Sequence, residues 1–155
     1  MSKIMLSLSY MKKLLTILLF ILISSVLFAD QLYTLEKAIL MADSRLAHGI
    51  LIENYKSEAE FEKQAGTQIE FALINLDSRD MLTEDWYDLA LYCLARKYKY
   101  YNLALRLLKK EYEIEKYPRL SRWIMSRVKL LEAPGYSEES FNVTEELRDF
   151  RRRVF

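Results

Sequence analysis

The sequence contains few of the residues that interrupt helices, form disulfides or bind metals. Its 155 residues include three glycines, two prolines, one cysteine and one histidine. Because the single Cys93 excludes an intramolecular disulfide, the fold must be stabilised by packing, and we expect this thiol in the core. A lone His48, with no HExxH or GxSxG motif near it, does not support a zinc site or a Ser/His/Asp triad.

Other chemical motifs are also missing. The sequence has no glycine-rich phosphate loop and no cysteine pair, so it predicts neither a nucleotide site nor structural zinc. Two carboxylate pairs have i,i+4 spacing, Glu58 with Glu62 and Glu111 with Glu115, but both lie among lysines, as is typical of solvated helix faces. We therefore expect no catalytic residue, no cofactor and no metal. A small cell-wall hydrolase, which needs carboxylates in a sugar cleft, is kept as a third alternative.

Acidic residues are absent from the first 29 positions. Three lysines, Lys3, Lys12 and Lys13, precede an apolar run from Leu14 to Phe28 that only a threonine and two serines interrupt. The order basic, apolar, small is that of a secretory signal, so residues 1–29 are predicted to be a signal peptide and residues 30–155 the mature domain. Met11 is an alternative start, because MKKLLTILLF by itself resembles a bacterial signal.

The alternative interpretation of this leader is an uncleaved membrane anchor. Residues 14–28 are fewer than the roughly 20 residues that span a bilayer, but a retained leader would place them in contact with the inner membrane. Cleavage removes three of the 23 basic residues and none of the 22 acidic ones, which leaves a mature net charge of about −2. Such a chain has no long-range attraction to nucleic acid. The predicted location is therefore periplasmic or in the cell envelope.

After Asp30, apolar residues recur every three or four positions, and strand-like alternation is absent. This period is typical of amphipathic helices, so the sequence predicts an all-α fold. The expected helices run from Leu32 to about Tyr55, from Ser57 to Leu76, from Thr83 to Lys97, from Tyr101 to Ile114, from Pro118 to Leu131 and from Thr144 to Phe155. We expect them to form three antiparallel pairs in a short solenoid, with a compact helical bundle as the alternative.

The helix boundaries carry their own signals. Ser57 with Glu60 has capping-box spacing, and KYKYY and APGY are the expected turns. Thr83 and Thr144 are the expected caps of their helices, because acidic residues that suit the helix dipole follow each of them: Glu84 and Asp85, and Glu145 and Glu146. The predicted core positions are Leu35, Ile39, Ala42, Leu46, Ile50, Phe61, Ala65, Ile69, Ala72, Leu76, Trp86, Leu89, Ala90, Cys93, Leu94, Tyr101, Ala104, Leu105, Leu108, Tyr112, Leu120, Trp123, Ile124, Val128 and Leu131.

The stretch from Glu84 to Pro118 resembles one degenerate tetratricopeptide repeat, whose pattern is W-x2-L-G-x2-Y, A-x3-F and P. The residues that carry the resemblance are Trp86, Leu89, Ala90, Cys93, Ala104, Leu108 and Pro118. Alanine replaces the family's glycine, cysteine its tyrosine and leucine its phenylalanine. The resemblance implies a noncatalytic interaction scaffold, and that family has no catalytic residues to carry over.

Two sets of residues are candidates for binding. Tyr87, Tyr98, Tyr100 and Tyr101 are the aromatic residues least committed to the predicted core, and tyrosine combines a large contact area with a polar tip. We therefore predict that they bind a partner protein in the bacterial envelope. The basic run at the C-terminus, Arg151, Arg152 and Arg153, is a candidate contact with an anionic membrane or an acidic protein surface. The alternative is a helix end whose cations suit the dipole.

Overall fold

The computed structural model describes residues 2–49, 55, 57–75, 84–114, 117–137 and 141–155, without the side chains at 2–9, 23–32, 84–85 and 114. These residues are helical apart from turns and short connections, which confirms the predicted all-α class. The helices are α1 (Ser2–Gly49), α2 (Glu58–Ile74), α3 (Glu84–Lys97), α4 (Tyr101–Ile114), α5 (Pro118–Leu131) and α6 (Val143–Val154).

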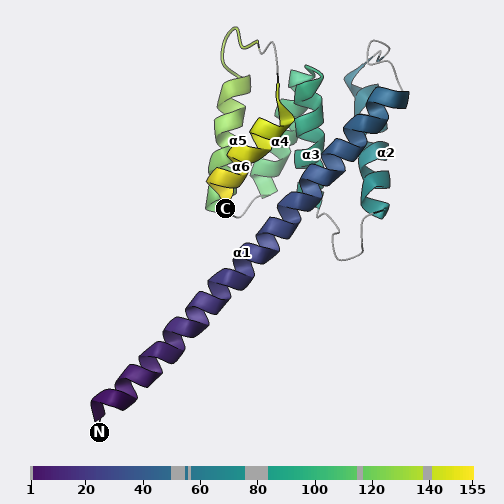
Figure 1. The fold of residues 1–155 in the computed structure, drawn as a ribbon. Helices are drawn as coiled ribbons and strands as arrows, with labels where there is room; N and C mark the ends of the chain where they lie inside the picture. The colour runs from purple at the N-terminus through teal and green to yellow at the C-terminus, as the bar shows by residue number, and fades with distance from the viewer. Residues whose placement is uncertain (1, 50–54, 56, 76–83, 115–116, 138–140) are drawn as a thin grey trace.

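Helix α1 has two parts with different surroundings. Its C-terminal part crosses the body formed by the other helices, whereas its N-terminal part projects away from that body (Figure 1). The side chains of residues 10–22 are exposed, and the first buried side chains among those described are Thr34 and Leu35. In the part of the chain that the structure describes, no helix is both long and apolar enough to cross a membrane. The predicted cleavage point, after Ala29, lies within residues 23–32, whose side chains the structure does not describe.

Helix boundaries follow local chemistry. The Ser57 hydroxyl accepts a hydrogen bond from the Glu60 amide at 3.2 Å, as predicted, and Pro118 occupies the start of α5. The prediction of Thr144 as a cap is wrong: the Asn142 side chain caps α6 by accepting hydrogen bonds from the Thr144 and Glu145 amides. Asparagine accepts such bonds as well as threonine does, and it stands two residues earlier.

The turns also lie where they were predicted. Between α3 and α4, Lys99 adopts a φ of 64°, and the Tyr100 amide bonds to the Ala95 carbonyl at 2.8 Å. After α5, Gly135 has a φ of 73° and the Tyr136 amide bonds to the Ala133 carbonyl at 3.0 Å. The left-handed conformation is unfavourable for lysine but not for glycine. The surrounding turn must therefore hold Lys99 in this conformation.

Helix α3 lies at the centre of the core. Every residue from Asp88 to Arg96 is buried, because α3 contacts α1, α2, α4 and α6. Cys93 is buried as expected, and burial raises the pKa of its thiol. The predicted core positions are buried with few exceptions: Trp86, Tyr101, Leu105 and Leu131 are half-buried, and Tyr112 is exposed. Ile50, Leu76 and Thr83 lie outside the described residues.

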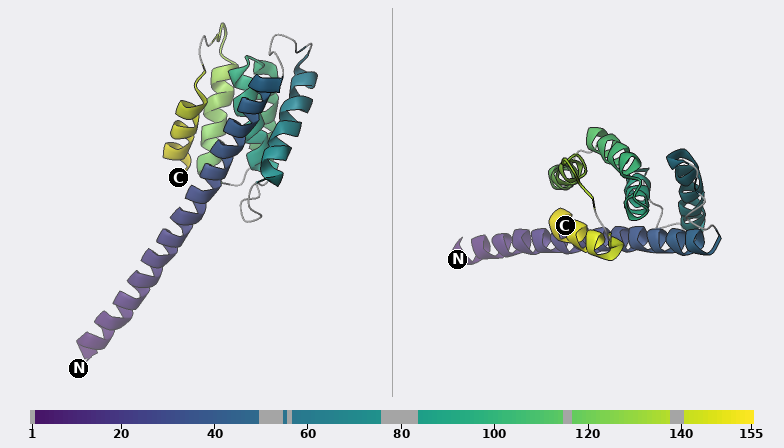
Figure 2. Two further views of the ribbon diagram at one scale, coloured as in Figure 1. Left: turned by 45° about the vertical axis from the view of Figure 1, so that its right-hand side comes forward. Right: turned by 90° about the horizontal axis from the view of Figure 1, so that it is seen from above.

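Helix α6 brings the C-terminus back onto the body. It contacts α5, its neighbour in sequence, and also α3 and α1 (Figure 2). In a solenoid each repeat contacts only its neighbours. The contact between the first and last helices, α1 and α6, was therefore not predicted from the sequence pattern. The consequence is that residues 143–154 and residues of α1 share one core.

Gly66, in the middle of α2, is buried against Tyr87 of α3. A Cβ at this position would lie 2.5 Å from Tyr87 Oη and 3.8 Å from Cζ. The hydroxyl, and not the ring, therefore excludes a larger side chain. Close approach of α2 and α3 explains why a residue with poor helix propensity stands inside a helix.

We predict that the effect of Gly66→Ala on stability changes sign with the residue at position 87. In the wild-type background the clash should destabilise the protein by about 1–2 kcal/mol. In the Tyr87→Phe background the hydroxyl is gone, and alanine should stabilise α2 by up to about 1 kcal/mol. Urea denaturation followed by circular dichroism measures both values. An equal effect in the two backgrounds would contradict the packing described.

Candidate functional site

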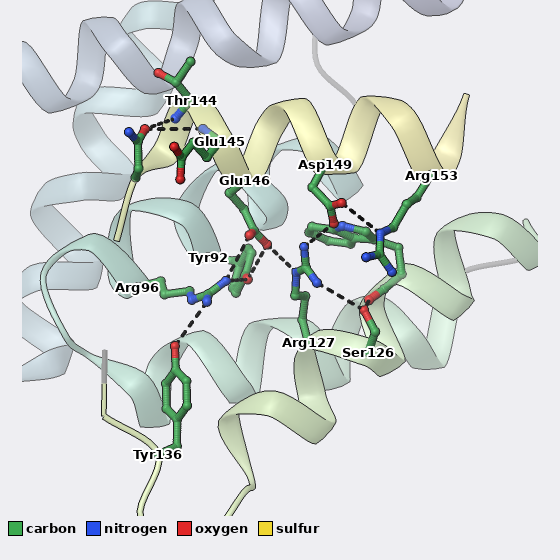
Figure 3. A network of polar contacts seen from close by, with 12 residues as sticks. Tyr92, Arg96, Ser126, Arg127, Tyr136, Thr144, Glu145, Glu146, Asp149 and Arg153 are labelled. Carbon is green, nitrogen blue, oxygen red and sulfur yellow. Dashed lines mark hydrogen bonds and ion pairs between the residues drawn. The ribbon is translucent and has the colours of Figure 1, made fainter. Parts of the chain in front are cut away.

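A buried carboxylate holds α6 against the body. Glu146, in the first turn of α6, accepts hydrogen bonds from the Tyr92 hydroxyl at 2.9 Å and from Arg127 Nε at 2.6 Å. It also forms an ion pair with Arg96 at 3.1 Å, in which the two side chains are only 8% and 3% exposed. Figure 3 shows Glu146 between these groups from α3 and α5. We call the surface of α3 and α5 around Tyr92, Arg96 and Arg127 the α6 seat.

The position of Arg96 is fixed from several sides. Its Nη1 donates to the Tyr92 hydroxyl at 2.9 Å, and its Nη2 donates to the Tyr136 hydroxyl at 3.1 Å. The guanidinium also lies 4.5 Å from the centre of the Phe141 ring. Burial lowers the pKa of Arg96, but Tyr92 and Glu146 raise it by more. The α6 seat therefore holds a fixed positive charge where Glu146 enters.

A second carboxylate of α6 extends the network. Arg127 donates from Nη2 to Asp149 Oδ2, and Asp149 Oδ1 accepts from Arg152 at 2.7 Å and from Arg153 at 2.9 Å. Burial raises the pKa of the Asp149 carboxyl, but hydrogen bonds from Arg153, Arg152 and Arg127 outweigh it and lower this pKa to about 2. Arg127 thus bridges two acids of α6.

Aromatic packing completes the α6 seat. Phe150 is 2% exposed and meets Trp123 and Trp86 edge-to-face, with ring centroids 4.9 and 5.7 Å apart. Phe155 stacks on Trp86 at 6.5 Å. Since the chain has only two tryptophans, both next to Phe150, its tryptophan fluorescence reports directly on whether α6 is docked.

A second candidate surface lies on the side of α1 that faces away from the core. Tyr33 and Leu40 are 64% and 59% exposed there. We define the outer face by the residues that line a depression of about 410 Å³: Tyr33, Glu36, Lys37, Leu40, Met41, Ser44 and Arg45. Leu40 also lines a second depression of about 460 Å³, between α1 and the start of α6. The Arg45 guanidinium lies 3.9 Å above the exposed Phe71 ring, which connects the outer face to α2.

The four predicted tyrosines are more committed to packing than expected. The Tyr98 hydroxyl donates to Asp43 at 2.6 Å, and Tyr100 stacks on Phe61 at 4.7 Å. Tyr101 meets the Tyr136 ring edge-to-face at 5.5 Å. Tyr87 contacts the helix at Gly66, and burial raises its pKa to about 12. The expectation that these four tyrosines take little part in core packing is therefore wrong. Their binding of a partner protein stays a prediction.

The structure does not bring the tyrosines together into one site. Tyr98 and Tyr100 share the cluster around Phe61, whereas Tyr101 lies against the turn after α5 and Tyr87 against α2. The three C-terminal arginines, Arg151, Arg152 and Arg153, also have different surroundings. Arg152 and Arg153 pair with Asp149, and Arg151 is exposed. Contact of these arginines with an anionic surface stays a prediction.

Within the described part of the chain, no group of three or more His, Cys, Asp or Glu side chains is placed to hold a metal ion. His48 is exposed on the last turn of α1, and Glu62 of the first carboxylate pair is bound by Arg106. The expectation of a solvated face is wrong for Glu111 of the second pair, which is buried.

Sequence reasoning missed the α6 seat. Glu146 was interpreted as a first-turn acid that complements the helix dipole, and Arg96 and Arg127 were not singled out. A signal was present, since Glu146, Leu147 and Phe150 have the spacing of one helix face, and α6 buries these three residues. A glutamate on an otherwise apolar helix face indicates a cationic partner.

Comparisons with known proteins provide no relative. The sequence matches no protein-family model, no curated protein and no solved structure.

We predict that Glu146→Gln weakens the docking of α6 by about 3 kcal/mol, because it removes the buried carboxylate that Arg96 and Arg127 both bind. Urea titration followed by tryptophan fluorescence measures this loss. Glu145→Gln is the matched control: Glu145 is exposed and one position away, so its effect should stay within about 0.5 kcal/mol. Equal effects of the two substitutions would contradict the role of Glu146.

We also predict that Asp149 contributes to docking in a pH-dependent way. Its pKa is lowered in the folded chain, so its contribution is complete above about pH 4 and is lost as the pH falls to about 2. The difference in docking free energy between wild type and Asp149→Asn should therefore shrink towards zero over this range. A difference that stays constant from pH 5 to about pH 2 would show that the carboxylate is not held by the arginines.

Proposed function

We propose that the chain is a noncatalytic, exported helical scaffold of the bacterial cell envelope that binds another protein through the outer face. This proposal rests on one observation: exposed apolar side chains lie together around Leu40. Leu40 lines both depressions, and charged side chains such as Glu36 and Lys37 surround it. An apolar centre with a polar rim is the usual anatomy of a protein-binding surface.

Export is supported by the separation between the leader and the core. The exposed residues 10–22 are apolar apart from Lys12, Lys13 and Thr16, and the first buried residue among those described is Thr34. Cleavage after Ala29 would therefore remove no described core side chain. The outer face begins at Tyr33, so it would remain whole in the mature protein.

A repeat-like scaffold is supported by the packing of consecutive helices. Helix α3 packs on α4, and α4 packs on α5, as neighbouring helices of a tetratricopeptide-like array do. The contact of α6 with α1 is more typical of a closed bundle. In both arrangements the outer face of α1 lies on the side away from the core.

The alternative is a membrane-anchored subunit of an envelope complex. One observation favours it, the continuity of α1 from Ser2 to Gly49. If the leader is retained, a single helix would join the exposed apolar residues 10–22 to the body, and the outer face would lie close to the membrane.

The test is site-specific photo-crosslinking in intact cells. A photoreactive residue at position 40 should give one discrete adduct, because this position is the centre of the outer face. The same residue at position 129, an exposed site on α5, is the matched control and should give none. N-terminal sequencing of the same purified protein should begin at Asp30, whereas a retained leader would favour the anchored alternative. No adduct at position 40, or the same adducts at both positions, would contradict the proposal.

A further inference from the structure

The α6 seat has the chemistry of a helix-binding groove. Its walls carry two fixed cations, Arg96 and Arg127, and two indole rings, Trp86 and Trp123, all supplied by α3 and α5. The occupant supplies both carboxylates, Glu146 and Asp149. The charges in the groove are therefore complementary, with arginines on the body and carboxylates on the side of α6 that faces them.

The contacts that define the occupant are few. Helix α6 buries three side chains, Glu146, Leu147 and Phe150, and these share one face. Its other described side chains are half-buried or exposed. Recognition thus depends on a carboxylate, a leucine at the next position and an aromatic ring four residues after the carboxylate. Such sparse anchors on one helical face are the usual form of helix-in-groove recognition.

The position of α6 in the fold is compatible with its exchange. This helix buries only three side chains, whereas every residue of α3 from Asp88 to Arg96 is buried. Elements with few buried contacts are those that open at the lowest free energy.

We propose that the α6 seat is a binding site for an amphipathic helix of a partner protein that carries this carboxylate–leucine–aromatic pattern, and that α6 is its built-in competitor. This site is separate from the outer face, so the inference goes beyond the proposed function and does not depend on it. A partner helix would pair its carboxylate with Arg96 and Arg127 and place its aromatic ring between Trp86 and Trp123.

The experiment starts from the full chain with a protease site inserted in the exposed turn Ala133–Gly135. Cutting there separates α6 from α5 in the folded protein. The probe is a fluorescent peptide with the sequence of residues 141–155, and its binding is followed by anisotropy. Binding to the cut chain should be at least about tenfold tighter than to the uncut chain, because the covalent link gives α6 a high effective concentration.

Peptide variants test the chemistry. Glu146→Gln and Phe150→Ala in the peptide should each weaken binding at least about tenfold, whereas Arg151→Ala, at an exposed position, should change it less than about twofold. An alanine-based helix that carries only the glutamate, leucine and phenylalanine at the same spacing should also bind. Its binding distinguishes a site for partner helices from a site that only α6 fits.

Five results would overturn the proposal. The body could unfold when the chain is cut, which circular dichroism would show, and α6 would then be a structural element and not an exchangeable one. The peptide could fail to bind, or all variants could bind equally. The alanine-based helix could fail to bind where the α6 peptide succeeds. Finally, light scattering could show that the uncut chain is a dimer that exchanges α6 between copies, which would make a second copy the occupant. The crosslinking test at position 40 uses the intact chain, so its result is scored separately from these.

Discussion

The arrangement of the C-terminal half depends on one buried carboxylate. Glu146 is nearly inaccessible to solvent, and two guanidinium groups and one phenol satisfy it. A buried charge is tolerated only when such partners are present, because its desolvation is costly. Tyr92 and Arg96 come from α3 and Arg127 from α5, so the same interaction that stabilises Glu146 also sets the position of α6 relative to both helices.

This constraint connects the core to the surfaces. Helix α3 is buried from Asp88 to Arg96 and carries Tyr92 and Arg96 one turn apart, so the central helix supplies both apolar packing and the fixed charge of the α6 seat. Docking of α6 in turn places residues 141–145 beside Leu40 and Asp43 of α1. The two candidate surfaces therefore meet along α1, although different side chains form them.

The helical period predicted most of the core, because burial of one helix face depends on residues three and four positions apart. Leu35, Phe61, Leu89 and Ile124 were placed in this way. Contacts that join distant parts of the chain were not predictable. Glu146 meets Tyr92 across 54 positions and Arg127 across 19, and Tyr98 meets Asp43 across 55. For the same reason the tyrosines at the α3–α4 turn were expected to be free and are packed.

The central claim is that Glu146 holds α6 locally, while the rest of the core stands on its own packing. Hydrogen–deuterium exchange of the Glu146→Gln variant tests it most directly. The account predicts that amides of residues 147–154 lose their protection, while amides of α3 and α4 keep theirs. Uniform loss of protection across all helices, or unchanged protection in α6, would contradict it.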